Sequence, residues 1–244
     1  MKKWYVACLL LLAVCLPWEK QEQILSADAY AELPVQGKYV ALTFDDGPRR
    51  ATTALLLDGL QERGASATFF LVGEQLAGNE DLVLRMVQEG HQIGNHTWSH
   101  KSLLKGNKED FTAEIQRVTA ALNQLVGLDS YWIRPPYGQI STECMKIAAV
   151  PLVKWSVDPR DWENRDSERI VQAVLENIEP GSVVLLHDIY PTSVAAALQL
   201  VDRLTAWGYE FVTVEELLAL YGIRPQAGVM YRSAVGQITS TGTS

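Results

Sequence analysis

Two adjacent carboxylates mark the point where an apolar stretch of the sequence stops. Asp45 and Asp46 follow the apolar run 39–44 and precede Gly47-Pro48, a dipeptide that breaks regular structure. Neighbouring side chains of a strand point to opposite faces, so both carboxylates face one cleft only where the strand is ending. The pattern predicts a buried strand that ends in a reactive rim, although an Asp-rich turn has the same local sequence.

A pair of histidines four residues apart supplies metal-ligand chemistry. His96 and His100 would lie on one face of a helical turn, where both imidazoles can reach a single metal ion. Two histidines and one carboxylate leave an open coordination position, which is typical of catalytic rather than structural metal sites. Surface histidines, or histidines that are satisfied in the core, can show the same spacing, so the pair is a modest signal by itself.

Three further clusters contain side chains of catalytic types. They are Arg134-Pro-Pro-Tyr-Gly138, Asp158-Pro-Arg-Asp-Trp162 and His187-Asp188. An arginine can bind a carboxylate through two hydrogen bonds, and a histidine can exchange a proton near neutral pH. Each cluster also has a structural interpretation: a rigid turn, a charged turn covered by a tryptophan, and a histidine satisfied in the core.

Strands and helices alternate along the chain and determine where these clusters lie. Helical patterns separate the expected strands, which cover residues 39–45, 67–72, 91–94, 131–133, 152–157, 182–186 and 211–214. This alternation predicts an α/β fold in which about seven parallel strands form a closed or nearly closed barrel, with a doubly wound open sheet as the alternative. All five clusters directly follow strands, whose carboxyl ends converge on one face, so we expect a single site there.

The two ends of the chain differ from its body. Residues 1–31 start with Met1-Lys2-Lys3 and an apolar run, which predicts a secretion signal or a membrane anchor. Cys15 follows a run that resembles a lipidation motif, but we favour plain export. We interpret residues 32–36 as a short linker, 37–221 as the catalytic domain and 222–244 as a loose tail. The expected location is therefore outside the cytoplasm, with membrane contact only through an uncleaved leader.

Composition limits the partners of the protein. The 244 residues are 48% hydrophobic, enough for one large core, and carry a net charge of −8. Binding to nucleic acid or to an anionic membrane through charge needs a basic surface, so both are disfavoured. No Gly-rich phosphate loop follows a strand, and the sequence indicates no protein partner. Cys144 is the only cysteine after the leader, and we expect it to be a buried thiol.

Together the five clusters resemble the motifs of the polysaccharide deacetylases of carbohydrate esterase family four, which include chitin and peptidoglycan N-acetylglucosamine deacetylases. The resemblance runs from about residue 39 to residue 218, in the right order and with no motif residue substituted. It implies a distorted (β/α) barrel and a divalent metal cofactor, with zinc favoured over cobalt.

The resemblance also implies roles for the first three motifs. The metal ligands would be Asp46, His96 and His100. Asp45 would be the general base, and Arg134 would orient it. The backbone N–H at Tyr137 would help to hold the oxyanion.

The remaining motifs imply an acid and a sugar-binding surface. His187 would be the general acid, steadied by Asp158 or Asp161, of which we favour Asp158. Aromatic side chains in the motifs could stack on sugar faces, and these substrate-binding candidates are Trp98, Tyr137 and Trp162.

The function that the resemblance implies is a metal-dependent hydrolase that removes N-acetyl groups from N-acetylglucosamine in a cell-wall polysaccharide. Peptidoglycan is the favoured substrate, chitin or chito-oligosaccharides are the alternative, and N-acetylmuramic acid as the deacetylated sugar stays open. Two other classes fit part of the pattern. A non-haem iron oxygenase also uses two histidines and a carboxylate but has no need of His187. A glycan-binding module without turnover would release no acetate.

Overall fold

The computed structural model describes residues 37–235 apart from residues 106 and 129. The expected leader, the expected linker and residues 236–244 of the expected tail lie outside the described residues.

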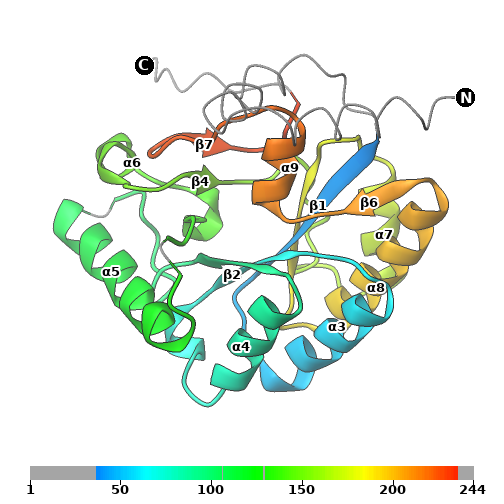
Figure 1. The fold of residues 1–244 in the computed structure, drawn as a ribbon, viewed down its shortest axis with the longest axis horizontal. Helices are drawn as coiled ribbons and strands as arrows, with labels where there is room; N and C mark the ends of the chain where they lie inside the picture. Colours follow the sequence, from blue (N-terminus) through cyan, green and yellow to red (C-terminus); the bar gives the residue numbers. More distant parts are fainter. Residues whose placement is uncertain (1–36, 106, 129, 236–244) are drawn as a thin grey trace, which may run out of the picture. The chain divides into compact units, whose positions relative to one another are not determined.

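One strand, β1 (Lys38–Asp45), lies at the centre of the fold. It runs diagonally through Figure 1 and pairs in parallel with β2 (Thr68–Leu71), β5 (Val183–His187) and β6 (Tyr209–Phe211). Residues 40–44 are almost fully buried because strands of a parallel sheet are covered on both faces. β3 (Gln92–Asn95) extends the sheet beyond β2, which gives the order β3-β2-β1-β5 with β6 beside the start of β1.

The seven-stranded barrel predicted from the sequence is only partly realised. A second, two-stranded sheet pairs β4 (Leu152–Val153) in parallel with β7 (Met230–Tyr231). Residues 131–133, expected to be a strand, form only single parallel bridges from Ile133 to Asn95 and Leu152. The backbone N–H of Arg134 still donates to Asn95, but Pro135 and Pro136, which cannot donate backbone hydrogen bonds, then end the pairing. All the ladders among the described residues are parallel. They form two separate sheets and do not join into one closed barrel.

Helices cover the outside of the sheet in a continuous series. In Figure 1, α5 (Lys108–Leu125), α4 (Glu80–Gln88), α3 (Arg50–Glu62) and α8 (Pro191–Ala206) follow one another around it, and α7 (Ser167–Leu175) packs on α8. Each buries one apolar stripe, as Leu82, Val83 and Met86 do on α4. Among the helices of the described residues, none combines the length and the apolar character needed to cross a membrane.

Two expectations near the C-terminus were wrong. The strand expected at 211–214 ends at Phe211, because Thr213 caps the short helix α9 (Val214–Leu220) with a reciprocal capping box to Glu216. The tail expected to be loose from residue 222 contains β7, and Tyr231 and Ala234 are buried in the core. The ordered domain therefore extends at least to residue 235. Cys144, in α6 (Thr142–Ile147), is fully buried, as expected.

Candidate active site

The carboxyl ends of β1 and β5 bring the first and last motifs together. The parallel register pairs Asp45 with His187, the final residue of each strand. Asp46 then leaves the strand with φ of 72°, a left-handed conformation that turns its side chain to the same side as its neighbour. The sequence prediction that both carboxylates face one cleft at the end of the strand is confirmed: both line the same cavity.

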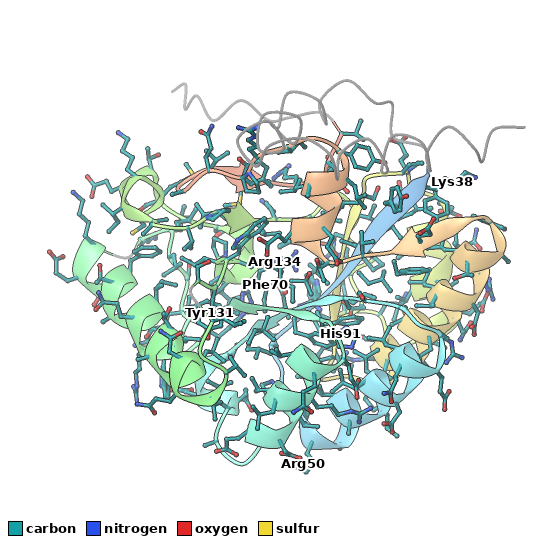
Figure 2. All side chains as sticks on the ribbon, viewed as in Figure 1. Lys38, Arg50, Phe70, His91, Tyr131 and Arg134 are labelled. Carbon is teal, nitrogen blue, oxygen red and sulfur yellow. The ribbon has the colours of Figure 1, made fainter. Side chains whose placement is uncertain are left out.

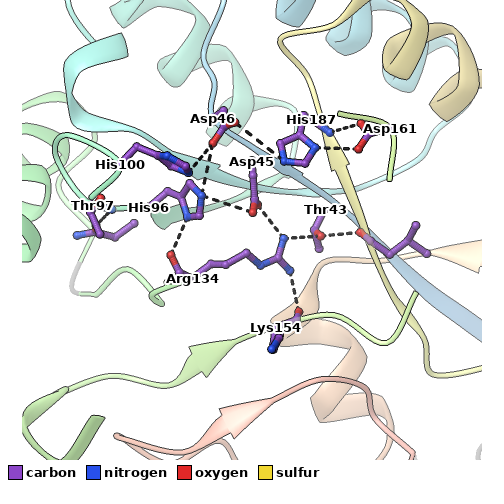
Figure 3. Close-up of polar contacts among 12 residues, drawn as sticks. Thr43, Asp45, Asp46, His96, Thr97, His100, Arg134, Lys154, Asp161 and His187 are labelled. Carbon is purple, nitrogen blue, oxygen red and sulfur yellow. Dashed lines mark hydrogen bonds and ion pairs between the residues drawn. The ribbon is translucent and has the colours of Figure 1, made fainter. Parts of the chain in front are cut away.

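His96 and His100 also meet at Asp46, but not through a helical turn. Residues 96–100 form an irregular loop in which Thr97 and His100 have φ of 69° and 55°. The Nε2 atoms of His96 and His100 lie 3.5 and 3.2 Å from Asp46 Oδ1 (Figure 3). The predicted convergence is therefore correct, whereas the predicted helix is wrong. Glu114 holds the loop, because its carboxylate accepts hydrogen bonds from the backbone N–H and the hydroxyl of Ser99.

These three side chains fit a divalent metal ion. Their ligand atoms all lie within 4.8 Å of one another. Asp46 Oδ1 is buried and has no hydrogen-bond partner among the described residues, which is costly unless a ligand such as a cation satisfies it. His96 Nδ1 donates to the carbonyl oxygen of Arg134 over 2.6 Å, so the lone pair of Nε2 faces Asp46.

Arg134 organises the other side of the site. Figure 2 shows it in the interior of the domain, and its side chain is fully buried. Nη1 donates to Asp45 Oδ1 over 2.8 Å and to Thr43 Oγ1 over 2.7 Å, and Nη2 donates to the Lys154 carbonyl oxygen over 2.9 Å. The same residue therefore fixes the Asp45 carboxylate through its side chain and His96 through its carbonyl group. The sequence predicted the contact with Asp45 but not the one with His96.

His187 is held by Asp161 and not by Asp158, which was the favoured candidate. Asp161 is fully buried, and its Oδ1 lies 2.8 Å from His187 Nδ1 while its Oδ2 accepts from the His187 backbone N–H. Asp158 instead accepts from the backbone N–H of Arg160. The reason is local: Arg160 has φ of 53°, and this turn directs the two carboxylates of the segment to different places.

The charges of the site shift two pKa values strongly. Burial would raise the pKa of Asp46, but the imidazoles of His96, His187 and His100 outweigh it and lower this pKa to about 2. Burial would lower the pKa of His187, but the hydrogen bond and charge of Asp161, with smaller contributions from Asp45 and Asp46, raise it to about 9. At neutral pH the site therefore combines an ionised carboxylate with an imidazolium.

Asp188, the residue after His187, lies buried behind the site and helps to hold it in place. Asp188 is fully buried and accepts a hydrogen bond from the hydroxyl of Thr53 on α3. Burial raises the pKa of Asp188 to about 7. Gly47 leaves room for this carboxyl group, since a side chain at position 47 would collide with it. The contact connects the loop that carries the paired aspartates to the end of β5.

A cavity of about 400 Å³ opens above these groups. Its lining residues are Asp45, Asp46, His96, His100, Tyr137, Trp155, Asp158, Trp162, Leu185 and His187. Tyr137 is 61% exposed and its ring contacts that of His100 edge to face, while Trp162 is 45% exposed. Both aromatic rings are therefore available to a ligand, as the sequence predicted.

Trp98, the third predicted substrate-binding aromatic residue, does not line this cavity. Its ring packs beside Gly73 and against the main hydrophobic core, and the Arg117 guanidinium lies 3.7 Å from the ring centroid. The left-handed conformation of Thr97 turns Trp98 toward α5. Trp155, which the sequence analysis did not select, lines the cavity instead. Trp155 lay inside the expected strand 152–157, whereas the observed strand ends at Val153, so no signal in the sequence marked it as a residue of the site.

Backbone strain is concentrated in this region. Among the described residues, the non-glycine residues with positive φ are Asp46, Thr97, His100, Tyr137 and Arg160, and every one belongs to a sequence motif. Such conformations cost about 1–3 kcal/mol each and cluster at functional sites. The surrounding fold therefore stabilises a geometry that the local sequence does not favour.

Comparison with known proteins agrees with this geometry. Residues 32–150 match the family model described as polysaccharide deacetylase. The peptidoglycan-N-acetylglucosamine deacetylase PgdA of Listeria monocytogenes is 37% identical over 194 residues, which cover 80% of this chain and 41% of that protein. The peptidoglycan-N-acetylmuramic acid deacetylase PdaC of Bacillus subtilis is 35% identical over 197 residues, 81% of this chain and 42% of that protein. The chain thus spans about two fifths of the length of these relatives.

Other relatives match over nearly their whole length. A peptidoglycan-N-acetylglucosamine deacetylase of Bacillus cereus is 38% identical over 195 residues, which cover 77% of this chain and 91% of that protein. The structure titled T48 deacetylase with substrate has a TM-score of 0.77 and 40% identity over 82% of this chain and 99% of its own. A family 4 acetyl xylan esterase from Clostridium thermocellum, in complex with a cobalt ion, has a TM-score of 0.77 and 32% identity over 81% of this chain and 100% of its own. The chain therefore belongs to the polysaccharide deacetylase family.

Proposed function

We propose that the protein is a metal-dependent hydrolase that removes N-acetyl groups from N-acetylglucosamine residues of peptidoglycan. The observation that carries the proposal is the arrangement around Asp46. Its buried Oδ1, which has no hydrogen-bond partner in the described part of the chain, faces two imidazoles, with Asp45 on one side and His187 on the other. The relatives that are peptidoglycan-N-acetylglucosamine deacetylases support deacetylation of a cell-wall glycan.

Asp46, His96 and His100 are the proposed metal ligands. A divalent cation bound there would polarise the amide carbonyl and lower the pKa of a water molecule. We favour zinc, with cobalt as the alternative, since two imidazole nitrogens and one carboxylate suit either ion. Beyond these three side chains, a fourth ligand position would be left to water and substrate on the side of the cavity that Asp46 lines.

Asp45 is the proposed general base. Its Oδ1 is occupied by Arg134, and its Oδ2 lies 3.6 Å from His96 Nε2, on the side of the proposed metal ligands. This carboxylate takes the proton of the attacking water, whose oxygen adds to the carbonyl carbon of the N-acetyl group. The backbone N–H of Tyr137 is the proposed hydrogen-bond donor to the oxyanion.

His187 is the proposed general acid. Asp161 accepts from Nδ1, so Nε2, which lies 4.0 Å from Asp46 Oδ2, carries the proton that can be donated to the amide nitrogen. The C–N bond then breaks, and the products are acetate and the glucosamine unit. Asp161 is the positioning residue that keeps the imidazolium charged and oriented.

Mass spectrometry of muropeptides after treatment of purified cell walls tests this function. Loss of acetyl groups from N-acetylglucosamine supports it. Loss confined to N-acetylmuramic acid, the substrate named for PdaC, would contradict the choice of sugar. Rapid turnover of chito-oligosaccharides with no change in peptidoglycan would favour the chitin alternative. We also propose that the enzyme acts outside the cytoplasm, as its first residues and this substrate suggest.

A further inference from the structure

The small β4–β7 sheet brings two cations together beside the active site. The register pairs Leu152 with Met230 and Val153 with Tyr231, and the backbone N–H of Lys154 donates to the Tyr231 carbonyl oxygen over 2.7 Å. Lys154 and Arg232 therefore follow side by side at the carboxyl ends of parallel strands, the ends that face the active site in this fold. Figure 1 shows β4 and β7 adjacent to each other.

These two cations border a cavity of about 540 Å³ with an apolar floor. Besides Lys154 and Arg232, the lining residues are Leu104, Gly138, Gln139, Ile140, Met145 and Met230. In the part of the chain that the structure describes, neither cation forms an ion pair. Burial lowers the pKa of Lys154, and the charge of Arg232 lowers it further. In a chain of net charge −8, these two adjacent cations, which have no counterion among the described residues, form a local concentration of positive charge.

The cationic cavity shares a wall with the active-site cavity. Tyr137 and Trp155 line the active-site cavity. Their chain neighbours Gly138 and Lys154 line the cationic cavity. A Cβ atom at Gly138 would lie 2.7 Å from Lys154 Cε, so the lysine stem packs directly beneath this wall. A glycan whose acetamido group enters the active site can thus place a neighbouring sugar unit over the two cations.

We propose that Lys154 and Arg232 form a subsite that binds a carboxylate carried by the sugar next to the one that is deacetylated. The inference rests on the proposed function and narrows its substrate to glycans with acidic substituents. In peptidoglycan this carboxylate belongs either to the lactyl ether of the neighbouring sugar or to the peptide attached there. Both cations can donate charge-assisted hydrogen bonds to it, and the apolar floor accommodates the methyl groups of either substituent. A neutral chitin chain gains nothing from this subsite.

Steady-state kinetics with four oligosaccharides tests the subsite. The substrates are a disaccharide-repeat tetrasaccharide with free lactyl carboxylates, the same compound with these carboxylates amidated, a form that carries the peptide, and chitotetraose. Relative to wild type, the Lys154→Met/Arg232→Gln double variant should raise KM by roughly tenfold or more for the carboxylate-bearing substrates, because each lost charge-assisted hydrogen bond costs about this factor. Its kcat, and its KM for chitotetraose and for the amidated compound, should match those of wild type. Arg169→Gln, which removes an exposed cation on α7, is the control and should change neither kcat nor KM for any of the four substrates.

The possible outcomes distinguish a failure of the subsite proposal from a failure of the proposed function. A KM increase with the lactyl form identifies the lactyl carboxylate, and an increase only with the peptide form identifies the peptide carboxylate; both support the subsite. Equal KM values for wild type and the double variant on both acidic substrates would overturn it. If wild type hydrolyses none of the four compounds, the proposed function fails, and calorimetric binding of the same compounds still decides the subsite: an unchanged ratio of acidic to amidated ligand affinity in the double variant contradicts it.

Discussion

Asp161 binds His187 at two points, through the ring Nδ1 and through the backbone N–H, each over 2.8 Å. The two contacts fix both the position of the imidazole at the end of β5 and the proton on Nδ1. Because Asp161 is fully buried, its charge is poorly screened and maintains the imidazolium. This pair makes the acid half of the proposed reaction available at neutral pH.

The Asp161→Asn variant should lose turnover and change its pH dependence. The pKa of His187 is raised from 6.5 to about 9, so wild-type activity should fall as the pH rises through about 9. Without the carboxylate charge this alkaline limb should move down toward pH 6.5, and kcat at pH 8 should drop by roughly 10²-fold. Asp158→Asn removes a carboxylate from the same segment and should leave the limb in place. A shift in Asp158→Asn but not in Asp161→Asn would reverse the assignment.

The same ion pair predicts a pH dependence of stability. A pKa that is higher in the folded than in the unfolded state stabilises the fold fully below the unfolded value of about 6.5. This contribution should be lost as the pH rises through about 9. Urea unfolding of wild type and Asp161→Asn at pH 6 and pH 10 measures this contribution. The difference in free energy of unfolding between the two proteins should be larger at pH 6 than at pH 10. A difference independent of pH would show that the pair does not titrate in this way.

Asp45→Asn and Asp46→Asn should separate catalysis from metal binding. The Asp45 variant should retain the metal and lose turnover by roughly 10²-fold or more, since its carboxylate is the proposed base. The Asp46 variant should lose metal affinity, since it removes a proposed ligand oxygen that has no hydrogen-bond partner among the described residues. Metal analysis of the purified variants, combined with acetate release, distinguishes them. An exchange of these two phenotypes would mean that the roles of the pair are reversed.

Arg134→Met should destabilise the fold as well as reduce activity. It leaves the nearly buried Asp45 carboxylate without its partner, and breaking a buried ion pair costs about 3–5 kcal/mol. Arg203→Met is a matched control, because Arg203 pairs with Glu168 at the surface, where an ion pair contributes at most about 1 kcal/mol. The free energy of unfolding in urea measures both, and equal losses would contradict the buried role of Arg134.

Trp162→Ala should weaken substrate binding without affecting the fold. The ring lies at the active-site cavity and is 45% exposed, so its removal should raise KM by roughly tenfold through lost stacking on a sugar face. Trp207 is 52% exposed at the end of α8 and does not line this cavity. Trp207→Ala should therefore leave KM unchanged, and an equal KM for both variants and wild type would exclude a substrate contact by Trp162.

The order of the elements and the convergence of the motifs could be predicted from the sequence. The alternating apolar patterns identify the helices and most strands, and the end of each strand then locates Asp45, His96 and His187 on one rim. The weaker predictions concern residues 131–133 and 230–231, where pairing depends on a partner strand distant in the sequence. Two-residue strands have too little periodicity to be recognised locally.

Side-chain directions inside the motif loops could not be predicted in the same way. The choice between Asp158 and Asp161, and the rotation of Trp98 away from the cavity, follow from the left-handed conformations of Arg160 and Thr97. Non-glycine residues adopt such conformations only when the surrounding fold imposes them. Local sequence preference therefore predicts the wrong backbone conformation, and so the wrong side-chain direction, at these positions. The types of the motif residues still predict where the site lies.

Acetate release by the metal-depleted enzyme tests whether hydrolysis depends on a metal ion bound at this site. After chelation, with metal content verified as nil, the enzyme should release no acetate from N-acetylated peptidoglycan, and added zinc or cobalt should restore the rate. His96→Ala and His100→Ala should fail to recover, because each lacks one of the three proposed ligands, Asp46, His96 and His100. Full activity of the metal-free wild-type enzyme would show that the hydrolysis needs no metal ion.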